Sequence, residues 1–213
     1  MEISNGNGSQ SLYEKGVNFL IRRYMERGRM LGSLSTSDGL IKYKDQLQIP
    51  ESELSTNYKI LDVGSGIELL FPRETIKNYP NMYGLITSLD TDFPNFSRKQ
   101  RELFQHEGID PVRGNVFHLK FGNETFDRVY SNNSISLYLS AFPDMAVKAI
   151  AEMLRVTKQG GLIRISPVDE EMKLVYANFL DQQNVLTKYS DQKVRGPYQK
   201  PDPDFQLLTI TKN

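Results

Sequence analysis

A strand that runs into a glycine-spaced turn carries the residues of this chain whose types and spacing best suit chemistry. The stretch YKILDVGSGIELLFPRE begins at Tyr58, places Asp62 at the end of an apolar run, and follows it with Gly64 and Gly66. Glycine adopts positive φ angles readily and lets the backbone approach a ligand closely. A carboxylate followed by such a turn favours a loop that binds a nucleotide cofactor.

Two common phosphate-binding fingerprints are missing from this loop. The dinucleotide pattern G-x-G-x-x-G would need a third glycine where Leu69 stands, and the pattern G-x-x-x-x-G-K-[ST] is absent. A cofactor that carries a pyrophosphate is therefore a poor match, which disfavours a nicotinamide-dependent dehydrogenase.

The composition narrows the class of protein. The 213 residues suit one domain, and the equal totals of 26 basic and 26 acidic residues argue against a general nucleic-acid binder. The absence of cysteine excludes disulfides, cysteine-ligated zinc and thiol catalysis. The polar start MEISNGNGSQS is unlike a signal peptide, and no apolar run approaches the ~20 residues that span a bilayer. We therefore expect a cytoplasmic protein that does not contact membranes.

Strand and helix patterns alternate after Tyr58, and they must position the glycine loop. The predicted strands cover residues 58–63, 83–89, 111–114, 126–131 and 162–166. The predicted helices cover residues 72–79, 95–107, 143–157 and 168–182, with Gly160 or Gly161 capping the third of them. Such alternation predicts a parallel sheet with helices on both faces. Residues 184–190 and 205–213 then predict an antiparallel pair that closes one edge.

The expected fold class is α/β: a Rossmann-like three-layer sandwich around a seven-stranded, mostly parallel sheet with an antiparallel last strand, plus an N-terminal helical lid. We expect residues 1–11 to form a disordered tail and residues 12–213 to form a single domain. Within that domain, residues 12–57 would form the N-terminal helix and lid, irregular over 32–57, and residues 58–213 the core.

Four pieces of sequence, in order, point to one family. They are ILDVGSG, LITSLDTD, GNVFHLKFGNETFDRVYSNNSI and AIAEMLRVTKQGGLIRIS. Over roughly Tyr58 to Ser166 the chain resembles the class I S-adenosylmethionine-dependent methyltransferases, particularly the small single-domain members that act on metabolites. The resemblance implies S-adenosylmethionine as cofactor, S-adenosylhomocysteine as product, and no metal.

The resemblance also implies roles for individual residues. Asp62 would orient the methionine amino group, and Asp90 would accept both ribose hydroxyls, with Asp92 as a nearby competitor for that role. Asn115 would accept a hydrogen bond from adenine N6 through its carbonyl oxygen. The residues assigned to the cofactor are Asp62, Gly64, Ser65, Gly66, Asp90, Thr91, Asn115, Val116 and Asn132.

The methyl acceptor leaves weaker marks in the sequence. Methyl transfer from a sulfonium is an in-line displacement that needs mainly proximity and orientation, with a general base for a protonated acceptor. His118 and Tyr138 are the candidate catalytic residues; the alternative for His118 is a surface or structural role, which its position favours over a base, and the Tyr138 ring could equally pack. The candidate substrate contacts are Tyr43, Asn133, Ser136 and Asp169; Asp169 would also suit the start of a helix.

Three residues depart from the family pattern. Glu68 stands where a third glycine is usual, Asn115 replaces an aspartate, and Lys120 replaces a proline. Pro72 suits a first helical turn and disfavours helical backbone just before it, so the helix should begin near Pro72. We therefore expect a longer loop over residues 65–71 with Glu68 directed away from the cofactor carboxylate, because like charges repel.

These observations favour a methyltransferase acting on oxygen, nitrogen or carbon of a small molecule, as a monomer or homodimer without nucleic acid or membrane partners. The alternative is a catalytically silent binding module or partner subunit of the same fold. The enzyme is the leading interpretation, and two features, the altered loop and the lack of a convincing base, support the alternative.

Overall fold

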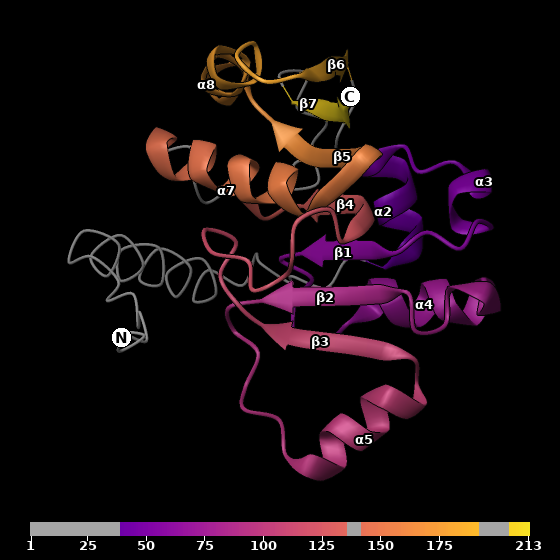
Figure 1. Cartoon of the computed structure of the whole chain (residues 1–213). Helices are drawn as coiled ribbons and strands as arrows, with labels where there is room; N and C mark the ends of the chain where they lie inside the picture. Colours follow the sequence, from indigo (N-terminus) through magenta and orange to yellow (C-terminus); the bar gives the residue numbers. More distant parts are fainter. Residues whose placement is uncertain (1–38, 136–141, 192–204) are drawn as a thin grey trace, which may run out of the picture. The chain divides into compact units, whose positions relative to one another are not determined.

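The computed structural model of the chain describes residues 39–135, 142–191 and 205–213. These residues contain a seven-stranded sheet in the order β3-β2-β1-β4-β5-β7-β6 (Figure 1). The strands are β1 (Ile60–Val63), β2 (Ile86–Asp90), β3 (Ile109–Arg113), β4 (Phe126–Asn132), β5 (Thr157–Val168), β6 (Val185–Asp191) and β7 (Gln206–Lys212). Strands β1 to β5 pair in parallel, whereas β7 is antiparallel to β5 and β6. The predicted sheet, with its antiparallel last strand, is confirmed.

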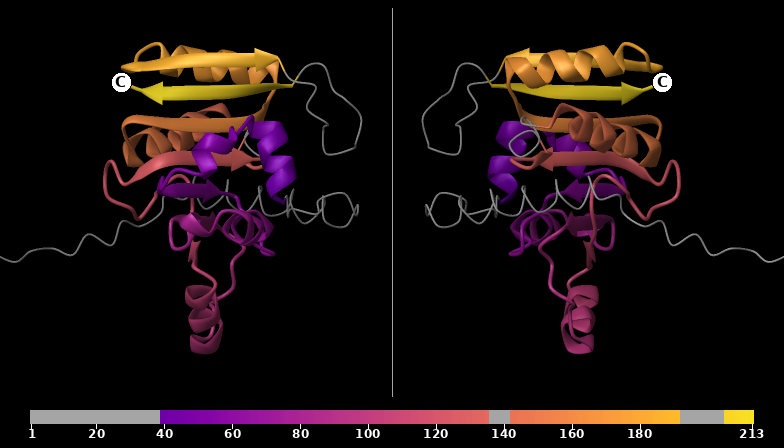
Figure 2. Two further views of the ribbon diagram at one scale, coloured as in Figure 1. Left: turned by 90° about the vertical axis from the view of Figure 1, so that its right-hand side faces the viewer. Right: turned by 90° about the vertical axis from the view of Figure 1, so that its left-hand side faces the viewer.

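Helices cover both faces of this sheet. They are α2 (Leu40–Leu47), α3 (Glu51–Leu54), α4 (Leu70–Asn78), the 3-10 helix η1 (Pro80–Met82), α5 (Arg98–His106), α7 (Pro143–Val156) and α8 (Glu170–Leu180). The crossover from β1 through α4 to β2 steps along the sheet in one direction, and that from β4 through α7 to β5 steps in the other. Right-handed crossovers of opposite direction place α4 and α7 on opposite faces. In Figure 2, β6 and β7 run across the view while β2 and β3 are foreshortened, which shows the twist of the sheet.

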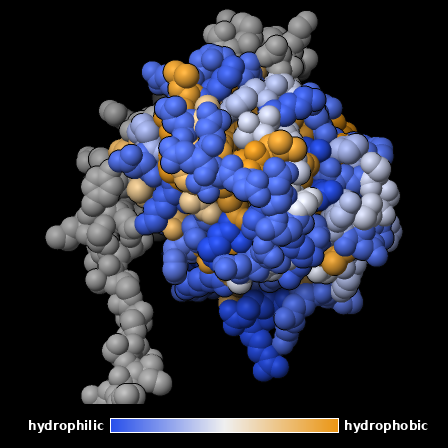
Figure 3. All heavy atoms as spheres, turned by 45° about the horizontal axis from the view of Figure 1, so that its top comes forward, coloured by the Kyte–Doolittle hydropathy of each residue, from blue (hydrophilic) through white to orange (hydrophobic). Residues whose placement is uncertain are grey.

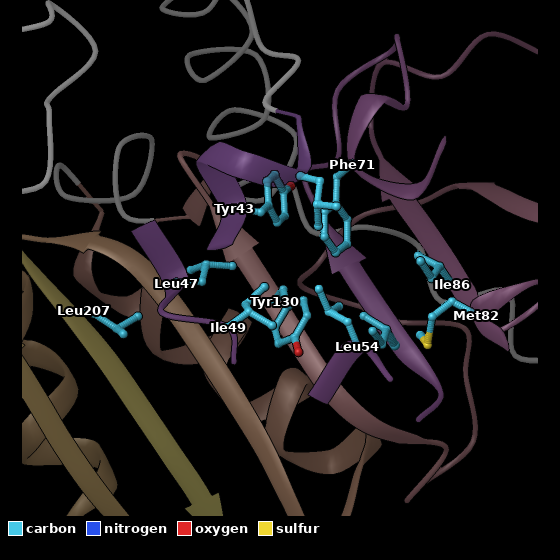
Figure 4. Close-up of a cluster of buried hydrophobic side chains, with 11 residues drawn as sticks. Tyr43, Leu47, Ile49, Leu54, Phe71, Met82, Ile86, Tyr130 and Leu207 are labelled. Carbon is cyan, nitrogen blue, oxygen red and sulfur yellow. The ribbon is translucent and has the colours of Figure 1, made fainter. Parts of the chain in front are cut away.

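The segment before β1 is helical and buried, which corrects the prediction that residues 32–57 are irregular. Leu40, Tyr43 and Leu47 follow helical spacing and are buried, so α2 presents one apolar face to the sheet. Figure 4 shows the cluster that results between α2, α3, α4 and the strands. Its buried members are Leu40, Tyr43, Leu47, Ile49, Leu54, Ile60, Phe71, Met82, Ile86, Tyr130 and Leu207.

The glycine pair after α7 does not cap that helix, contrary to prediction. α7 ends at Val156 and β5 begins at Thr157, so the chain passes directly from helix to strand. Gly160 has a φ of +69°, and a Cβ at Gly161 would lie 2.7 Å from the carbonyl oxygen of Lys158. The pairing of β4 with β5 shifts register here. The two glycines therefore serve a β-bulge, for which helical periodicity gives no signal.

Several predictions fall outside the described residues. The tail and first helix lie within residues 1–38, Ser136 and Tyr138 within 136–141, and the proline-rich linker within 192–204. In the part that is described, no helix combines the length and apolar character needed to cross a membrane. The surface in Figure 3 is mostly hydrophilic, with small separate hydrophobic patches. Exposed apolar side chains include Leu174 of α8 and Leu186 of β6.

Candidate functional site

The predicted cofactor residues gather where the strand order reverses. β1 lies between β2 and β4, and the arrowheads of β1, β2 and β3 point to the same edge in Figure 1. Ligands of open α/β sheets bind beyond the carboxyl ends of the strands at such a switch point. Asp62, Asp90 and Asn132 stand at the carboxyl ends of β1, β2 and β4.

The loop after β1 requires glycine at its first position. Gly64 has a φ of +75°, and a Cβ there would lie 2.3 Å from the Cβ of Ser134. Ser134 follows β4, and its hydroxyl donates to the Val63 carbonyl at 2.9 Å. The backbone of the loop therefore packs directly against the segment after β4, which leaves no room for a side chain.

Leu69 stands where the dinucleotide pattern would need its third glycine, and it adopts the left-handed conformation. Its φ of 55° and ψ of 38° turn the chain into α4, which begins at Leu70. The prediction of a helix start near Pro72 is wrong by two residues, because a left-handed Leu69 turns the chain earlier and Pro72 still lies in the first turn, where its missing N–H is tolerated. Leu69 is 1% exposed and packs with Phe93, Phe104 and Ile109. Burial therefore offsets the strain that a branched residue carries at positive φ.

Glu68 has an exposed side chain, and its carbonyl accepts a hydrogen bond from Arg73 Nη1 at 2.9 Å. Arg73 also contacts Glu107 at 3.2 Å. These contacts fix the backbone of the loop at Glu68. Its direction relative to a bound cofactor stays a prediction.

Asp62 is fully buried and is held by a tyrosine from α2. The Tyr43 hydroxyl donates to Asp62 Oδ1 at 2.8 Å, and the Tyr43 ring stacks on Phe71 with centroids 4.1 Å apart. Figure 4 shows Tyr43 and Phe71 facing one another above β1. Tyr43, predicted as a substrate contact, thus lies against Asp62, which is predicted to contact the cofactor, and 2% of the Tyr43 surface is exposed.

Asp90 joins the glycine loop to the end of β2. Its Oδ2 accepts from the Gly66 N–H at 3.0 Å, and its Oδ1 accepts from the Asp92 N–H at 2.8 Å. Asp92 therefore meets Asp90 through its backbone, while Thr91 between them is exposed. Asp90 holds the loop in shape from the strand where the ribose contact is predicted.

Asn115 forms a local turn at the end of β3. Its Oδ1 accepts from the Phe117 N–H at 3.0 Å, and its carbonyl accepts from the His118 N–H at 3.1 Å. Asn115 and Val116 are half-buried, whereas the His118 side chain is exposed. The oxygen predicted to accept from adenine therefore already accepts one backbone donor.

An ion pair on α7 clamps the segment that contains Lys120. Glu152 Oε2 accepts from the Leu119 N–H at 2.7 Å, and Arg155 Nη2 donates to the Leu119 carbonyl at 2.8 Å. The hydrogen bond from Arg155 lowers the pKa of Glu152, helped by the Leu119 N–H. Lys120 itself is exposed, so the departure from proline changes no buried contact.

The end of β4 carries two asparagines that share one partner. Asn132 Nδ2 and Asn133 Nδ2 donate to Gln46 Oε1 of α2 at 2.7 and 3.1 Å. Gln46 was not among the predicted site residues, because a lone glutamine in a segment predicted to be irregular gives no sequence signal. We call Tyr43, Gln46, Asp62, Asn132 and Asn133 the carboxyl-end cluster.

A second buried polar group lies under α3, further from the carboxyl ends. Glu53 Oε1 lies 2.6 Å from Arg164 Nη1 and 3.1 Å from Arg128 Nε, and it accepts a hydrogen bond from the Tyr130 hydroxyl. Burial and the Glu53 carboxylate raise the pKa of Tyr130 well above its usual range. We call Glu53, Arg128, Tyr130 and Arg164 the ionic cluster; nothing in the sequence patterns predicted it.

Asp169 caps a helix. Its Oδ1 accepts from the Met172 N–H at 2.8 Å at the start of α8, as the helix-start interpretation predicted. Its role toward a substrate stays a prediction. Over the described ranges 39–135, 142–191 and 205–213, no group of three or more histidine, aspartate or glutamate residues could hold a metal ion.

Comparison with known proteins agrees with this geometry. Residues 61–165 match the family model described as a methyltransferase domain. No curated protein matches the chain in sequence.

Solved structures share the fold at low identity. 1,6-Didemethyltoxoflavin-N1-methyltransferase of Burkholderia thailandensis, solved with 1,6-didemethyltoxoflavin and S-adenosylhomocysteine, has a TM-score of 0.61 at 13% identity and covers 97% of this chain and 93% of its own. Phosphoethanolamine N-methyltransferase 1 of Haemonchus contortus has a TM-score of 0.55 at 13% identity, covering 97% of this chain and 50% of its own. An S-adenosylmethionine-dependent methyltransferase of Mesorhizobium loti has a TM-score of 0.52 at 14% identity, covering 77% and 94%.

At these identities the solved structures establish the fold, and the family match adds the glycine loop and the strands that flank it. Together with Asp62 and Asp90 at adjacent strand ends, they lead to one family. Residues 61–165 form a methyltransferase domain, and the fold is that of the class I S-adenosylmethionine-dependent methyltransferases.

Proposed function

We propose that this chain transfers a methyl group from S-adenosylmethionine to oxygen, nitrogen or carbon of a small molecule. The observation that carries the proposal is the pair of carboxylates, Asp62 and Asp90, on either side of a loop whose two glycines have φ angles of +75° and +71°. Two solved relatives by fold, described above, are named for small nitrogen-containing acceptors, which supports the acceptor class.

The residues present fit this cofactor. Asp90 lies at the end of β2, and a carboxylate offers about four acceptor sites in two oxygens, which suits the two hydroxyls of a ribose. The Asn115 carbonyl oxygen likewise has a second lone pair for an adenine amino group. Asp62, Gly64, Ser65, Gly66, Asp90, Thr91, Asn115, Val116 and Asn132 would hold the cofactor, which supplies an electrophilic methyl group when bound.

The protein's own contribution is orientation. Asp62 and Asn132 are buried and held by α2, so the groups that would meet the methionine end keep fixed directions. Fixed directions supply the proximity that an in-line displacement needs. His118 and Tyr138 remain the proposed candidates for a base, and Asn133, Ser136 and Asp169 for substrate contacts. In place of a direct substrate contact, Tyr43 would act through Asp62.

Calorimetric titration of the full chain with S-adenosylmethionine and S-adenosylhomocysteine tests the cofactor. We expect dissociation constants in the micromolar range, lost in Asp90→Ala and largely kept in the matched control Asp92→Ala. Absence of binding by the unmodified chain would refute the proposal. A screen of small acceptors, read as formation of S-adenosylhomocysteine, then tests turnover; binding without any turnover would favour the silent partner subunit.

A further inference from the structure

Helix α2 spans the two strand ends that border the switch point, although it lies outside the matched residues 61–165. Tyr43 reaches Asp62 on β1, and Gln46 reaches Asn132 on β4 and Asn133 beyond it. Residues three apart share a helix face, so a single face of α2 makes both contacts. The same helix therefore holds both sides of the cofactor site.

Both contacts are buried and geometrically constrained. Tyr43 and Gln46 are 2% and 5% exposed, and the Tyr43 ring is stacked on Phe71 in the first turn of α4. α4 holds α2 in turn, because Glu74 Oε2 accepts from the Leu40 N–H at 2.7 Å. Buried hydrogen bonds in fixed geometry leave the groups they engage little freedom to turn.

These contacts also set which atom each site residue turns toward α2. The Tyr43 hydroxyl donates to Asp62 Oδ1, which fixes the plane of the carboxylate. Gln46 Oε1 only accepts, so it draws the Nδ2 atoms of Asn132 and Asn133 and turns their Oδ1 atoms away from it. A flipped asparagine would bring two oxygens together.

We propose that Tyr43 and Gln46 are positioning residues of the cofactor site. Through Asp62, Asn132 and Asn133 they preset the groups that meet the methionine end, so affinity for the cofactor depends on residues 40–47. This inference rests on the proposed function, and it extends the site beyond the part of the chain that matches the family.

The test uses the full chain and measures affinity for S-adenosylhomocysteine by calorimetry beside the thermal midpoint. Tyr43→Phe removes only the hydroxyl and should weaken binding about tenfold, the usual scale for a buried hydrogen bond to a charged group. Tyr130→Phe is the matched control, because it also removes a buried tyrosine hydroxyl that donates to a carboxylate. We expect it to lower the midpoint and leave the affinity unchanged.

Variants of Gln46 provide a second, independent test of the proposal. Gln46→Met keeps the shape and removes the acceptor, and we expect weaker binding about as large as for Tyr43→Phe. Gln46→Glu keeps an acceptor for both asparagines and should bind more tightly than Gln46→Met.

The outcomes separate the two hypotheses. If the unmodified chain binds and Tyr43→Phe and Gln46→Met bind equally well, this inference is wrong and the proposed function stands. If affinity simply follows the thermal midpoint across all variants, Tyr130→Phe included, the two residues are structural and the inference is again wrong. If the unmodified chain does not bind, the proposed function fails and this inference fails with it.

Discussion

One face of strand β4 contributes residues to both the ionic cluster and the carboxyl-end cluster. Arg128 and Tyr130 meet Glu53 of α3, and Asn132 meets Gln46 of α2. Each cluster joins a buried tyrosine hydroxyl to a buried carboxylate, Tyr130 to Glu53 in one and Tyr43 to Asp62 in the other.

The two clusters differ in the contacts described above for the carboxylate. Glu53 lies against two arginines, so the charges of the ionic cluster compensate each other inside the protein. The groups that α2 brings to the carboxyl-end cluster, Tyr43 and Gln46, are neutral and orient their partners without cancelling the charge of Asp62. Similar chemistry therefore joins α3 to the sheet in the ionic cluster and, in the site that we propose, orients binding groups under α2.

Removal of Glu53 should lower the stability of the protein strongly, because Glu53 is the carboxylate of the ionic cluster. Glu53→Ala leaves Arg128 and Arg164 buried without their carboxylate, and we expect a loss of about 3–5 kcal/mol in the free energy of unfolding, measured by urea denaturation. Glu51→Ala, on the same helix, removes a carboxylate that is 65% exposed and paired with Lys44. That control should cost about 1 kcal/mol or less. Equal losses would show that burial of the ionic cluster is energetically unimportant.

Leu69 shows where core and site overlap at the carboxyl ends. Leu69→Gly relieves a left-handed leucine but removes a side chain packed on Phe93 and Phe104. The lost packing outweighs the relieved strain, and we expect a net loss of about 1–3 kcal/mol in unfolding free energy. A stabilised variant would mean that the left-handed backbone at position 69 favours glycine more than it needs the packed leucine side chain.

Asp62→Asn should separate binding from stability. The amide keeps an acceptor for Tyr43 but loses the charge, so we expect affinity for S-adenosylhomocysteine to fall about tenfold, about 1.4 kcal/mol. The loss of stability should stay below that of Glu53→Ala, because the amide still accepts the Tyr43 hydrogen bond, whereas Glu53→Ala removes the carboxylate from two buried arginines. Unchanged affinity would remove Asp62 from the cofactor site.

The smallest expected effect concerns pH and lies outside both clusters. Arg155 and the Leu119 N–H lower the pKa of Glu152 in the folded chain, so its contribution is present above the unfolded value and is lost as pH falls through the folded value. We expect stability to decline below about pH 4.5, and Glu152→Gln to flatten that part of the profile. Thermal unfolding from pH 7 to pH 3 measures this, and identical profiles for the two chains would contradict it.

Much of the sheet and of the loop after β1 could be predicted from residue patterns. Alternating strands and helices predicted the parallel sheet, and Gly64 was correctly assigned to a tight turn because glycine at positive φ leaves a mark in the sequence. Local patterns misplaced the start of α4, since the left-handed conformation of Leu69 is stabilised by Phe93, Phe104 and Ile109, which come later in the chain. They also misassigned Gly160, whose bulge exists only because β5 pairs with β4.

The sequence by itself determined the succession of strands and helices along the chain, the glycine loop and the carboxylates at the strand ends. These features depend on short-range periodicity and on backbone freedom. Only the tertiary structure decided how those carboxylates are held. Tyr43 lies 19 residues from Asp62, and Gln46 lies 86 residues from Asn132. Such contacts form when burial brings distant segments together and every enclosed polar group must find a partner, and no local pattern records that choice.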